Sequence, residues 1–299
     1  MFDAEVRERA LAVAAEAAEL ADVRVVDVTD PITFTGVSHL FDDVWRPSGT
    51  TIMSRETLVA VAHAGGQVSA ALRGQTLIGA TAAFVGYSPA DREVFLHSHV
   101  TGVISEGEGR GVGRALKWHQ RAWCLERGVG RVRWTYDPLI RRNAVLNLLI
   151  LGARVVAYRE DVYGRMNDAR NAGAPTDRLV VDWELTAPRV EAAATGRVAE
   201  PDVGALRRAG AEPVLSVARD ATPHLTPAEA PRRLVQVPND IELLRARDPD
   251  LGSAWAAAIR ATLGAALDAG LRVTGVTRDG WYHLTSDHEV AELADHPSP

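Results

Sequence analysis

Cysteine is nearly missing from this chain of 299 residues, because Cys124 is the only one. A single cysteine excludes a disulfide within the chain and a zinc site built from cysteines. The chain has no run of about 18 apolar residues, so no membrane-spanning helix is expected. The first 20 residues are amphipathic and charged, without the basic start and apolar block of a signal peptide. We therefore expect a cytoplasmic protein with no membrane partner.

An excess of positive charge is missing as well. The formal net charge is −6 and neither end carries a basic tail. Nucleic-acid-binding proteins usually present a basic patch or stripe, so the charge argues against a nucleic acid as partner. The apolar fraction of 46% and the charged fraction of 24% are those of an ordinary globular protein. A chain of this length forms one large domain or two smaller ones.

The chain does contain a strand, a glycine-rich turn and a helix in direct succession. Residues 94–104 are rich in β-branched and aromatic side chains and predict the strand. Residues 112–127 predict the helix, which ends before Gly128. Between them, glycine occupies every second position, at Gly107, Gly109, Gly111 and Gly113. Glycines let a backbone approach a ligand, and a helix start offers free N–H groups. We therefore predict an anion site, to which Arg110 and Arg114 add positive charge.

Two common phosphate-binding motifs do not fit this turn. A Walker loop needs Gly-Lys followed by Ser or Thr, and the chain has no such triplet. The dinucleotide fingerprint needs glycines at relative positions 1, 3 and 6. The sixth position is Val112 counted from Gly107 and Arg114 counted from Gly109. Nucleotide or NAD binding is therefore disfavoured, and an ordinary strand-to-helix turn stays open as an alternative.

The turn resembles the acyl-CoA loop of the GNAT acetyltransferases. The family pattern is Gln or Arg, two residues, Gly, any residue, then Gly or Ala, and residues 108–113 read Glu-Gly-Arg-Gly-Val-Gly. The departure is Glu108, where the family has Gln or Arg. A second family signature, Asn-x-x-Ala ending in Gly-Phe, is similar to residues 143–153, where Ala153 stands in place of Phe.

The order of the predicted elements is that of the GNAT fold over about residues 20–186. The resemblance implies an α/β (α+β) fold with a mixed, mostly antiparallel central sheet flanked by helices. The strands on either side of the 112–127 helix are expected to be parallel. We expect a GNAT domain at residues 1–186, a linker at 187–233 rich in Ala, Pro, Arg and Glu, and a small C-terminal α/β extension at 234–288.

The individual elements follow from hydrophobic periodicity and from glycine and proline positions. The predicted helices cover residues 3–20, 34–45, 54–62, 112–127, 143–151, 240–247 and 251–269. The predicted strands cover residues 23–28, 66–72, 76–87, 94–104, 131–137, 153–163, 178–185, 213–217, 234–238, 271–277 and 280–285.

Further stretches are similar to one subgroup of predicted GNAT transferases that carries a C-terminal extension. They include residues 134–139 (Trp-Thr-Tyr-Asp-Pro-Leu), 98–99 (Ser-His) and 280–282 (Gly-Trp-Tyr). Some members of the subgroup are linked to amino-acid N-succinylation. The resemblance therefore implies an acyl-CoA-dependent N-acyltransferase with acetyl-CoA or succinyl-CoA as co-substrate. The acceptor would be a small-molecule amine, with an amino acid among the candidates, and a homodimer stays open.

Acyl transfer from CoA requires that the pyrophosphate is held and that the thioester carbonyl is polarised. The resemblance assigns the pyrophosphate to the backbone of residues 110–114. It assigns the carbonyl to an N–H of the preceding strand, around residues 102–104, where the strand splays from its neighbour and the acyl–pantetheine arm adds like an extra strand. A bulge is expected at Gly102. The predicted cofactor-binding residues are Gly102, Val103, Ile104, Gly109, Arg110, Gly111, Val112, Gly113, Arg114 and Asn143.

The acceptor amine must also lose a proton. His97 and His99 are two residues apart on a strand and share a face. A histidine with an ordinary pKa near ~6.5 suits a base at neutral pH, and His99 is the first candidate. A structural interior histidine is the alternative, and no third ligand points to a metal site. Asp137 is the second candidate base, with capping of the turn at Pro138 as its alternative role.

The proton donor for the leaving thiolate is the least explicit part of the sequence. Many GNAT enzymes have a tyrosine just before the Gly-Phe signature, but residues 148–151 read Leu-Leu-Ile-Leu. Tyr163 is the candidate substitute and Tyr158 another, unless the thiolate leaves unassisted. Glu106 could act through water, or be an ordinary solvated carboxylate. The alternative function is a non-catalytic GNAT-fold protein that binds acyl-CoA as a sensor or subunit.

Overall fold

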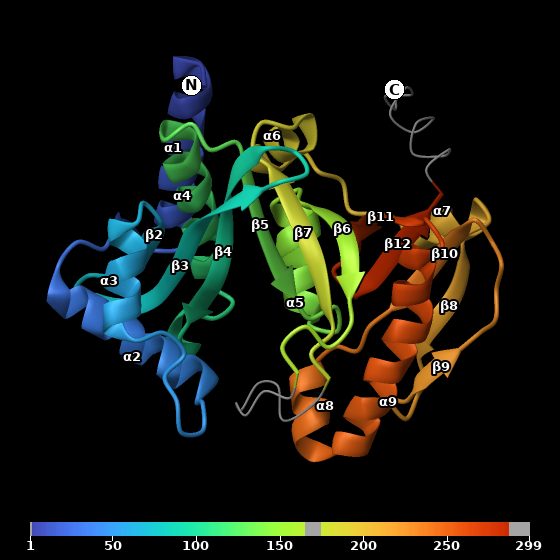
Figure 1. The fold of residues 1–299 in the computed structure, drawn as a ribbon. Coiled ribbons are helices and arrows are strands. Elements are labelled where there is room, and N and C mark those ends of the chain that lie inside the picture. The colour runs from blue at the N-terminus through green and yellow to red at the C-terminus, as the bar shows by residue number, and fades with distance from the viewer. Residues whose placement is uncertain (1, 165–174, 287–299) are drawn as a thin grey trace. The chain divides into compact units, whose positions relative to one another are not determined.

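The chain divides into two compact units (Figure 1). A computed structural model describes residues 2–164 and 175–286. The first unit holds residues 1–134 and 183–195, and the second holds residues 135–182 and 196–299. Within the described residues, no helix combines the length and the apolar character that crossing a bilayer requires.

The first unit is built on a mixed, mostly antiparallel sheet with the strand order β1-β2-β3-β4-β5. The strands are β1 (Arg24–Asp27), β2 (Gln67–Arg73), β3 (Thr76–Ser88), β4 (Glu93–Val103) and β5 (Arg131–Tyr136), whose last two residues belong to the second unit. Neighbours from β1 to β4 are antiparallel, and β4 and β5 are parallel, as predicted. The α/β fold expected from the sequence is therefore confirmed.

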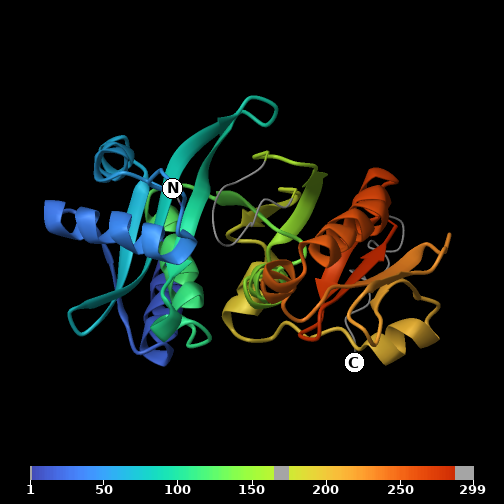
Figure 2. The same ribbon diagram turned by 90° about the horizontal axis from the view of Figure 1, so that it is seen from below.

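Helices cover both faces of this sheet (Figure 2). One face carries α1 (Ala4–Leu20) and α4 (Val112–Glu126), and the other carries α2 (Pro31–Trp45) and α3 (Arg55–His63). The start of α2 shows why the sequence folds this way. Asp30 accepts hydrogen bonds from the N–H groups of Ile32 and Thr33, and Pro31 sits at the first helical position. A short helix, α6 (Pro188–Ala194), completes the unit.

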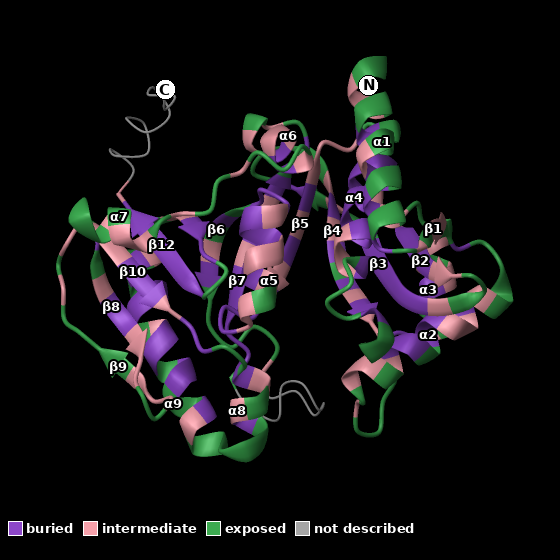
Figure 3. Cartoon of the chain, turned by 180° about the vertical axis from the view of Figure 1, so that it is seen from behind, coloured by how far each residue is buried: buried purple, intermediate pink, exposed green. Residues whose placement is uncertain are grey.

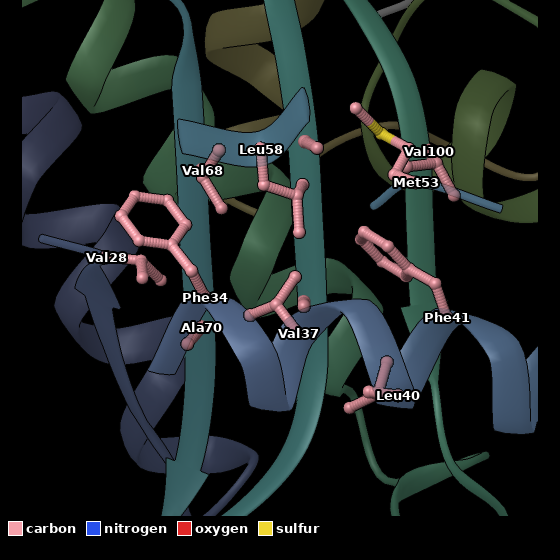
Figure 4. Packing of buried hydrophobic residues seen from close by; sticks show 12 residues of the cluster. Val28, Phe34, Val37, Leu40, Phe41, Met53, Leu58, Val68, Ala70 and Val100 are labelled. Atoms are coloured by element: carbon pink, nitrogen blue, oxygen red, sulfur yellow. The ribbon is translucent and has the colours of Figure 1, made fainter. Parts of the chain in front are cut away.

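The core of the first unit lies between the sheet and the two helices α2 and α3. It is formed by hydrophobic side chains that these helices and the strands point toward one another (Figure 4). Val37 and Phe41 of α2 and Leu58 of α3 are fully buried against the strands. Val68 of β2 and Val100 of β4 meet them from the sheet. Truncating a buried aromatic such as Phe41 to alanine typically costs about 3–5 kcal/mol. This core therefore fixes α2 against the end of β4 that matters for the site.

The second unit contains a strand pair and a second sheet. The pair is β6 (Arg154–Arg159) and β7 (Arg178–Glu184), and the second sheet has the order β11-β12-β10-β8-β9. Its strands are β8 (Glu212–Val217), β9 (Pro223–Leu225), β10 (Arg232–Gln236), β11 (Arg272–Val276) and β12 (Trp281–Thr285). The helices are α5 (Arg141–Ala144), which continues as a π-helical turn (Val145–Ile150), α7 (Val203–Arg208), α8 (Ile241–Arg247), α9 (Pro249–Ile259), a second π-helical turn (Arg260–Gly264) and α10 (Ala265–Asp268).

The observed elements reproduce the predicted ones within a few residues, but the expected linker is more ordered than its composition suggests. Residues 187–233 contain α6, α7, β8 and β9, of which only β8 was predicted. Leu215 of β8 is fully buried. Figure 3 shows buried segments along the strands of this second sheet. Residues 135–182 belong to the same unit as the C-terminal residues, because Tyr136 and Asp137 contact Tyr282 and Arg245. The domain boundaries at 186 and 233 stay a prediction beside this division.

Candidate active site

The glycine turn lies between the end of β4 and the start of α4. A 3₁₀ turn (Ser105–Gly107) leads into it, and Gly109 and Gly111 have φ angles of 72° and 84°. Other residues rarely adopt this left-handed region, which explains glycine at both positions. No side chain caps the start of α4. The first N–H groups of the helix, at residues 112–114, therefore have no intrahelical acceptor and suit an anion.

The charges that the sequence assigned to this turn lie beside it. Arg110 is exposed and Arg114 is half-buried. The Nε of Arg114 is buried and has no hydrogen-bond partner among the described residues. Gly107 is buried beneath the turn, where an added Cβ would lie 2.8 Å from Val103. The turn is thus held rigidly from below and offers N–H groups and guanidinium groups at its rim.

The bulge in β4 lies at His99 and not at Gly102, where it was expected. Ala82 of β3 is opposite Val100, and Ala83 is opposite Ser98, so His99 is the extra residue. Gly102 is glycine for a different reason. An added Cβ would lie 2.8 Å from Trp45 and 3.2 Å from Phe41, because α2 packs closely there. The sequence located the strand correctly and misplaced its irregularity by three residues.

We call the edge of β4 that faces away from β3 its free edge. In the first unit this edge pairs with β5 at Leu96–Val132 and His97–Arg133, and β4 itself continues to Val103. The rest of β5, Thr135 and Tyr136, belongs to the second unit, and the expected splay stays a prediction.

Strand geometry decides which N–H groups face that edge. The N–H of Ile104 donates to Ile78 of the β3 side. Because N–H groups alternate between edges, Val103 faces the free edge, and Gly102 and Ile104 face β3. Of the three predicted carbonyl-binding positions, only Val103 therefore offers its N–H to a ligand. Thr101 joins it by the same alternation.

The two histidines share a side of β4, as predicted. Their ring centroids are 6.1 Å apart, and both rings contact Phe84. Burial, together with the nearby charges of His99 and Lys117, lowers the pKa of His97 to about 4. Burial also lowers the pKa of His99, although its side chain is exposed at the bulge. Both imidazoles are therefore neutral at neutral pH, and His99 is the more accessible of the two.

Asp137 has the contacts of a structural carboxylate. It is buried, and one oxygen accepts a hydrogen bond from the N–H of Leu139 at 2.9 Å. The other oxygen pairs with Arg245 at 2.6 Å. These contacts correspond to the capping role that the sequence offered as the alternative for Asp137. Its role as a base stays a prediction.

The two candidate tyrosines differ. Tyr158 is buried and donates its hydroxyl proton to Asp177 at 2.6 Å, and burial raises the pKa of Tyr158. Tyr163 is exposed, with its hydroxyl 3.2 Å from the Thr135 hydroxyl. Of the two, only Tyr163 presents its hydroxyl at the surface, as a proton donor requires. Asn143 lies on α5, half-buried.

The structure thus brings together part of the predicted site. The glycine turn, Val103, His97 and His99 belong to one strand-turn-helix segment of the first unit. Asp137, Asn143 and Tyr163 belong to the second unit. Among the described residues, no three His, Cys, Asp or Glu side chains gather to hold a metal ion.

Comparison with known proteins adds fold relatives only. No family model and no curated protein matches the chain. Similar solved structures include the ribosomal-protein-S5-alanine acetyltransferase from Vibrio fischeri, at 16% identity over 55% of this chain and 94% of that one, with a TM-score of 0.44. They also include the ribosomal-protein-S18-alanine N-acetyltransferase from Escherichia coli, at 12% identity over 55% and 95%, with a TM-score of 0.42.

A third similar structure is a phosphinothricin acetyltransferase from Sinorhizobium meliloti in complex with AcCoA. It is 14% identical over 54% of this chain and 87% of that one, with a TM-score of 0.43. The described chain itself shows the element order, the β4 bulge and the uncapped start of α4. These features make up the mixed α/β fold that the resemblance to the GNAT acetyltransferases implied.

Proposed function

We propose that the protein is an acyl-CoA-dependent N-acyltransferase, which moves an acetyl or succinyl group from CoA to a small-molecule amine such as an amino acid. The observation that carries this proposal is the free edge of β4 between the bulge at His99 and the glycine turn. A strand edge of this kind accepts an extended amide-containing chain by strand addition. The pantetheine arm of CoA is such a chain.

The dimensions of the edge suit this ligand. The edge runs from Ser98 to Val103, which at ~3.3 Å per residue is about 20 Å. In the proposed arrangement, the N–H groups of residues 112–114 hold the pyrophosphate at one end. The thioester then lies near the bulge at the other end, where a β4 N–H polarises its carbonyl.

The chemical step would be direct attack. The amine nitrogen forms a bond to the thioester carbon, the carbon–sulfur bond breaks, and the amine proton passes to the neutral imidazole of His99. The CoA thiolate leaves, and its ordinary thiol pKa of about 8.5 makes a dedicated acid optional. Tyr163 is the donor that we propose if one is used.

A non-catalytic acyl-CoA-binding protein is the second candidate. It is favoured by the buried Leu148 and Leu149, which occupy the region where many GNAT enzymes have their acid. Tyr158 cannot easily substitute, because Asp177 and Arg260 hold it in a buried network. The two functions differ in one observable, since only the enzyme releases free thiol when it is given an amine.

A thermal-shift screen with CoA, acetyl-CoA, succinyl-CoA and NAD tests the proposal. A ligand that binds only the folded state raises the melting temperature. We expect a shift with acyl-CoA and none with NAD, followed by thiol release with a panel of amines that includes amino acids. A shift with NAD alone would contradict acyl-CoA binding, and acyl-CoA binding without thiol release from any amine would favour the second candidate.

A further inference from the structure

The only lysine of the chain is buried beside the proposed acyl site. The sequence has thirty-two arginines and one lysine, Lys117 of α4. Its side chain is only 5% exposed, and none of its contacts in the described chain is with a carboxylate. Arginine keeps its charge at any physiological pH, whereas a buried lysine can lose it. A lysine is therefore the cation that can occupy this place without a permanent unpaired charge.

Lys117 lies next to the last pair of β4 and β5 in the first unit. Its Nζ donates to the hydroxyl of Ser98 at 2.7 Å and lies 4.2 Å from the ring centroid of Trp134. Ser98 and Trp134 are the residues directly after His97 and Arg133, the last pair of the two strands. The amine therefore contacts both strands directly after their last pair.

A buried chain of hydrogen bonds fixes the amine in this position. Lys117 also donates to Oε1 of Gln120 at 3.1 Å, and Gln120 donates to Gln67 of β2 at 2.9 Å. All three side chains are buried. A hydrogen-bonded polar chain in a low-dielectric interior holds its members more rigidly than apolar packing does. Ser98 is thus linked through α4 to β2, two strands away from β4 in the sheet.

The hydrogen bond from Lys117 to Ser98 acts on the segment that holds the proposed base, because Ser98 lies between His97 and the bulge residue His99. The titratable groups that face Lys117 are few. Cys124 of α4 and His97 of β4 interact with its charge, and β2 and β5 contribute only neutral groups. The buried residues that α1 packs against α4 are alanines, namely Ala10, Ala14 and Ala17. A change of charge on Lys117 therefore acts on His97, the neighbour of Ser98.

We propose that Lys117 is a positioning residue for acyl transfer, which holds Ser98 and the bulge at His99 in place next to the last pair of β4 and β5 in the first unit. This inference rests on the proposed function. Lys117 does not touch the reacting atoms in this proposal and acts through Ser98. Burial lowers the pKa of Lys117 to about 7. The charge of the amine that holds Ser98 therefore changes as the pH passes through the neutral range.

The single lysine allows a direct test on the unmodified protein. Selective ¹³C labelling of lysine gives one side-chain signal, which can be followed by NMR as a function of pH with and without acetyl-CoA. We expect titration near neutrality and a change of the signal on acetyl-CoA binding. Titration in the ordinary range of about 10.4, or a signal that ignores bound acetyl-CoA, would overturn the inference.

Two substitutions test the effect on the rate. Lys117→Met keeps the volume and removes the amine, and Lys117→Arg keeps a charge that cannot be lost. We expect both to lower kcat by about 100-fold, the cost of a misplaced catalytic geometry. Both should also remove the change of rate near pH 7 that titration of Lys117 produces in the wild-type protein. Binding of acetyl-CoA should change little, because the pyrophosphate site is untouched. The matched control is Leu125→Ala, a buried change on the same helix at a residue without a titratable group, which should leave the pH profile unaltered.

The outcomes separate the two levels of the proposal. If the wild-type protein binds no acyl-CoA, the proposed function fails and the role of Lys117 with it. If it turns over but Lys117→Met retains the wild-type pH profile, or changes it no more than Leu125→Ala does, only the positioning role fails.

Discussion

His99 is the residue on which the proposed proton transfer depends. Replacing it with glutamine should lower kcat/KM by about 100-fold or more, since general bases contribute ~10²–10⁴. Because burial lowers the pKa of His99, the acidic limb of the wild-type pH–rate profile should lie below pH 6.5. Steady-state thiol release at several pH values measures both effects.

The matched control is His97→Gln on the same side of the strand. Acetyl-CoA binding should be retained in both variants. Full activity of His99→Gln would show that the base is another group, or that no side chain takes the proton.

Lys117 should also make the free energy of unfolding depend on pH. Its pKa is lowered in the folded state from 10.5 to about 7, so between these values the unfolded chain binds the proton and the folded chain does not. Stability should therefore rise with pH across this window, by up to about 1.4 kcal/mol per pH unit. Urea unfolding at pH 7.5, 8.5 and 9.5 measures the slope, and Lys117→Met should remove it. An equal slope in both proteins would contradict an uncharged buried lysine.

Asp137 was predicted from the sequence to be either a base or a cap of the turn at Pro138, and its contacts in the structure are those of a cap. The order Asp-Pro after a strand suggested both roles, and no sequence pattern indicated Arg245 as its partner. Because the pair is buried, Asp137→Asn should destabilise the protein by about 3–5 kcal/mol in denaturant unfolding. Replacing both residues by apolar ones should recover much of this loss. An Asp137→Asn protein of wild-type stability that had lost its activity would restore Asp137 as a catalytic residue.

At the scale of elements, the glycine turn makes the sharpest prediction. Gly111→Asp should weaken acetyl-CoA binding by at least ~10-fold, since a carboxylate at the helix start repels the pyrophosphate. The control is Gly128→Asp at the other end of α4, where φ is 77°. Both variants should lose roughly 1–2 kcal/mol of stability from backbone strain. Calorimetric titration should then show weakened binding in Gly111→Asp only; equal affinities would remove the turn from the site.

The elements themselves were largely predictable, because strands and helices follow local periodicity and their ends follow glycine, proline and capping residues. The bulge at His99 was not, since it depends on the register between β3 and β4. Gly102 misled the prediction because a glycine in a strand fits either a bulge or close packing. Its close neighbour, Trp45 of α2, is remote in the sequence. Burial of Lys117 was likewise invisible, because its partners Ser98 and Trp134 come from two other elements.

At the scale of the whole molecule, composition misjudged residues 187–233. Their alanine, proline and arginine content suggested a linker, yet β8 pairs in parallel with β10 inside the second sheet. Parallel pairing joins segments that are distant in sequence, so local composition carries no signal for it. The same holds for residues 135–182, whose buried polar groups find their partners near the C-terminus.

This arrangement predicts the effect of truncation. A chain that ends at residue 195 would keep Asp137 and Asp177 but lose Arg245 and Arg260, which pair with them. Unpaired buried carboxylates are strongly destabilising. We expect such a fragment to lose protected amides in residues 135–164 and 175–182 while the first unit retains its core. Wild-type protection of these two ranges in the fragment would show that they fold independently of the C-terminal residues.

Amide hydrogen exchange along β4, with and without acetyl-CoA, tests the central claim most directly. The claim is that the acyl–pantetheine arm adds to the free edge of β4 between Ser98 and Val103. The account predicts that acetyl-CoA slows exchange at Thr101 and Val103, whose N–H groups face that edge. It predicts little change at Gly102 and Ile104, whose N–H groups already bond to β3. Acetyl-CoA binding that protects amides elsewhere and leaves Thr101 and Val103 unchanged would contradict the account.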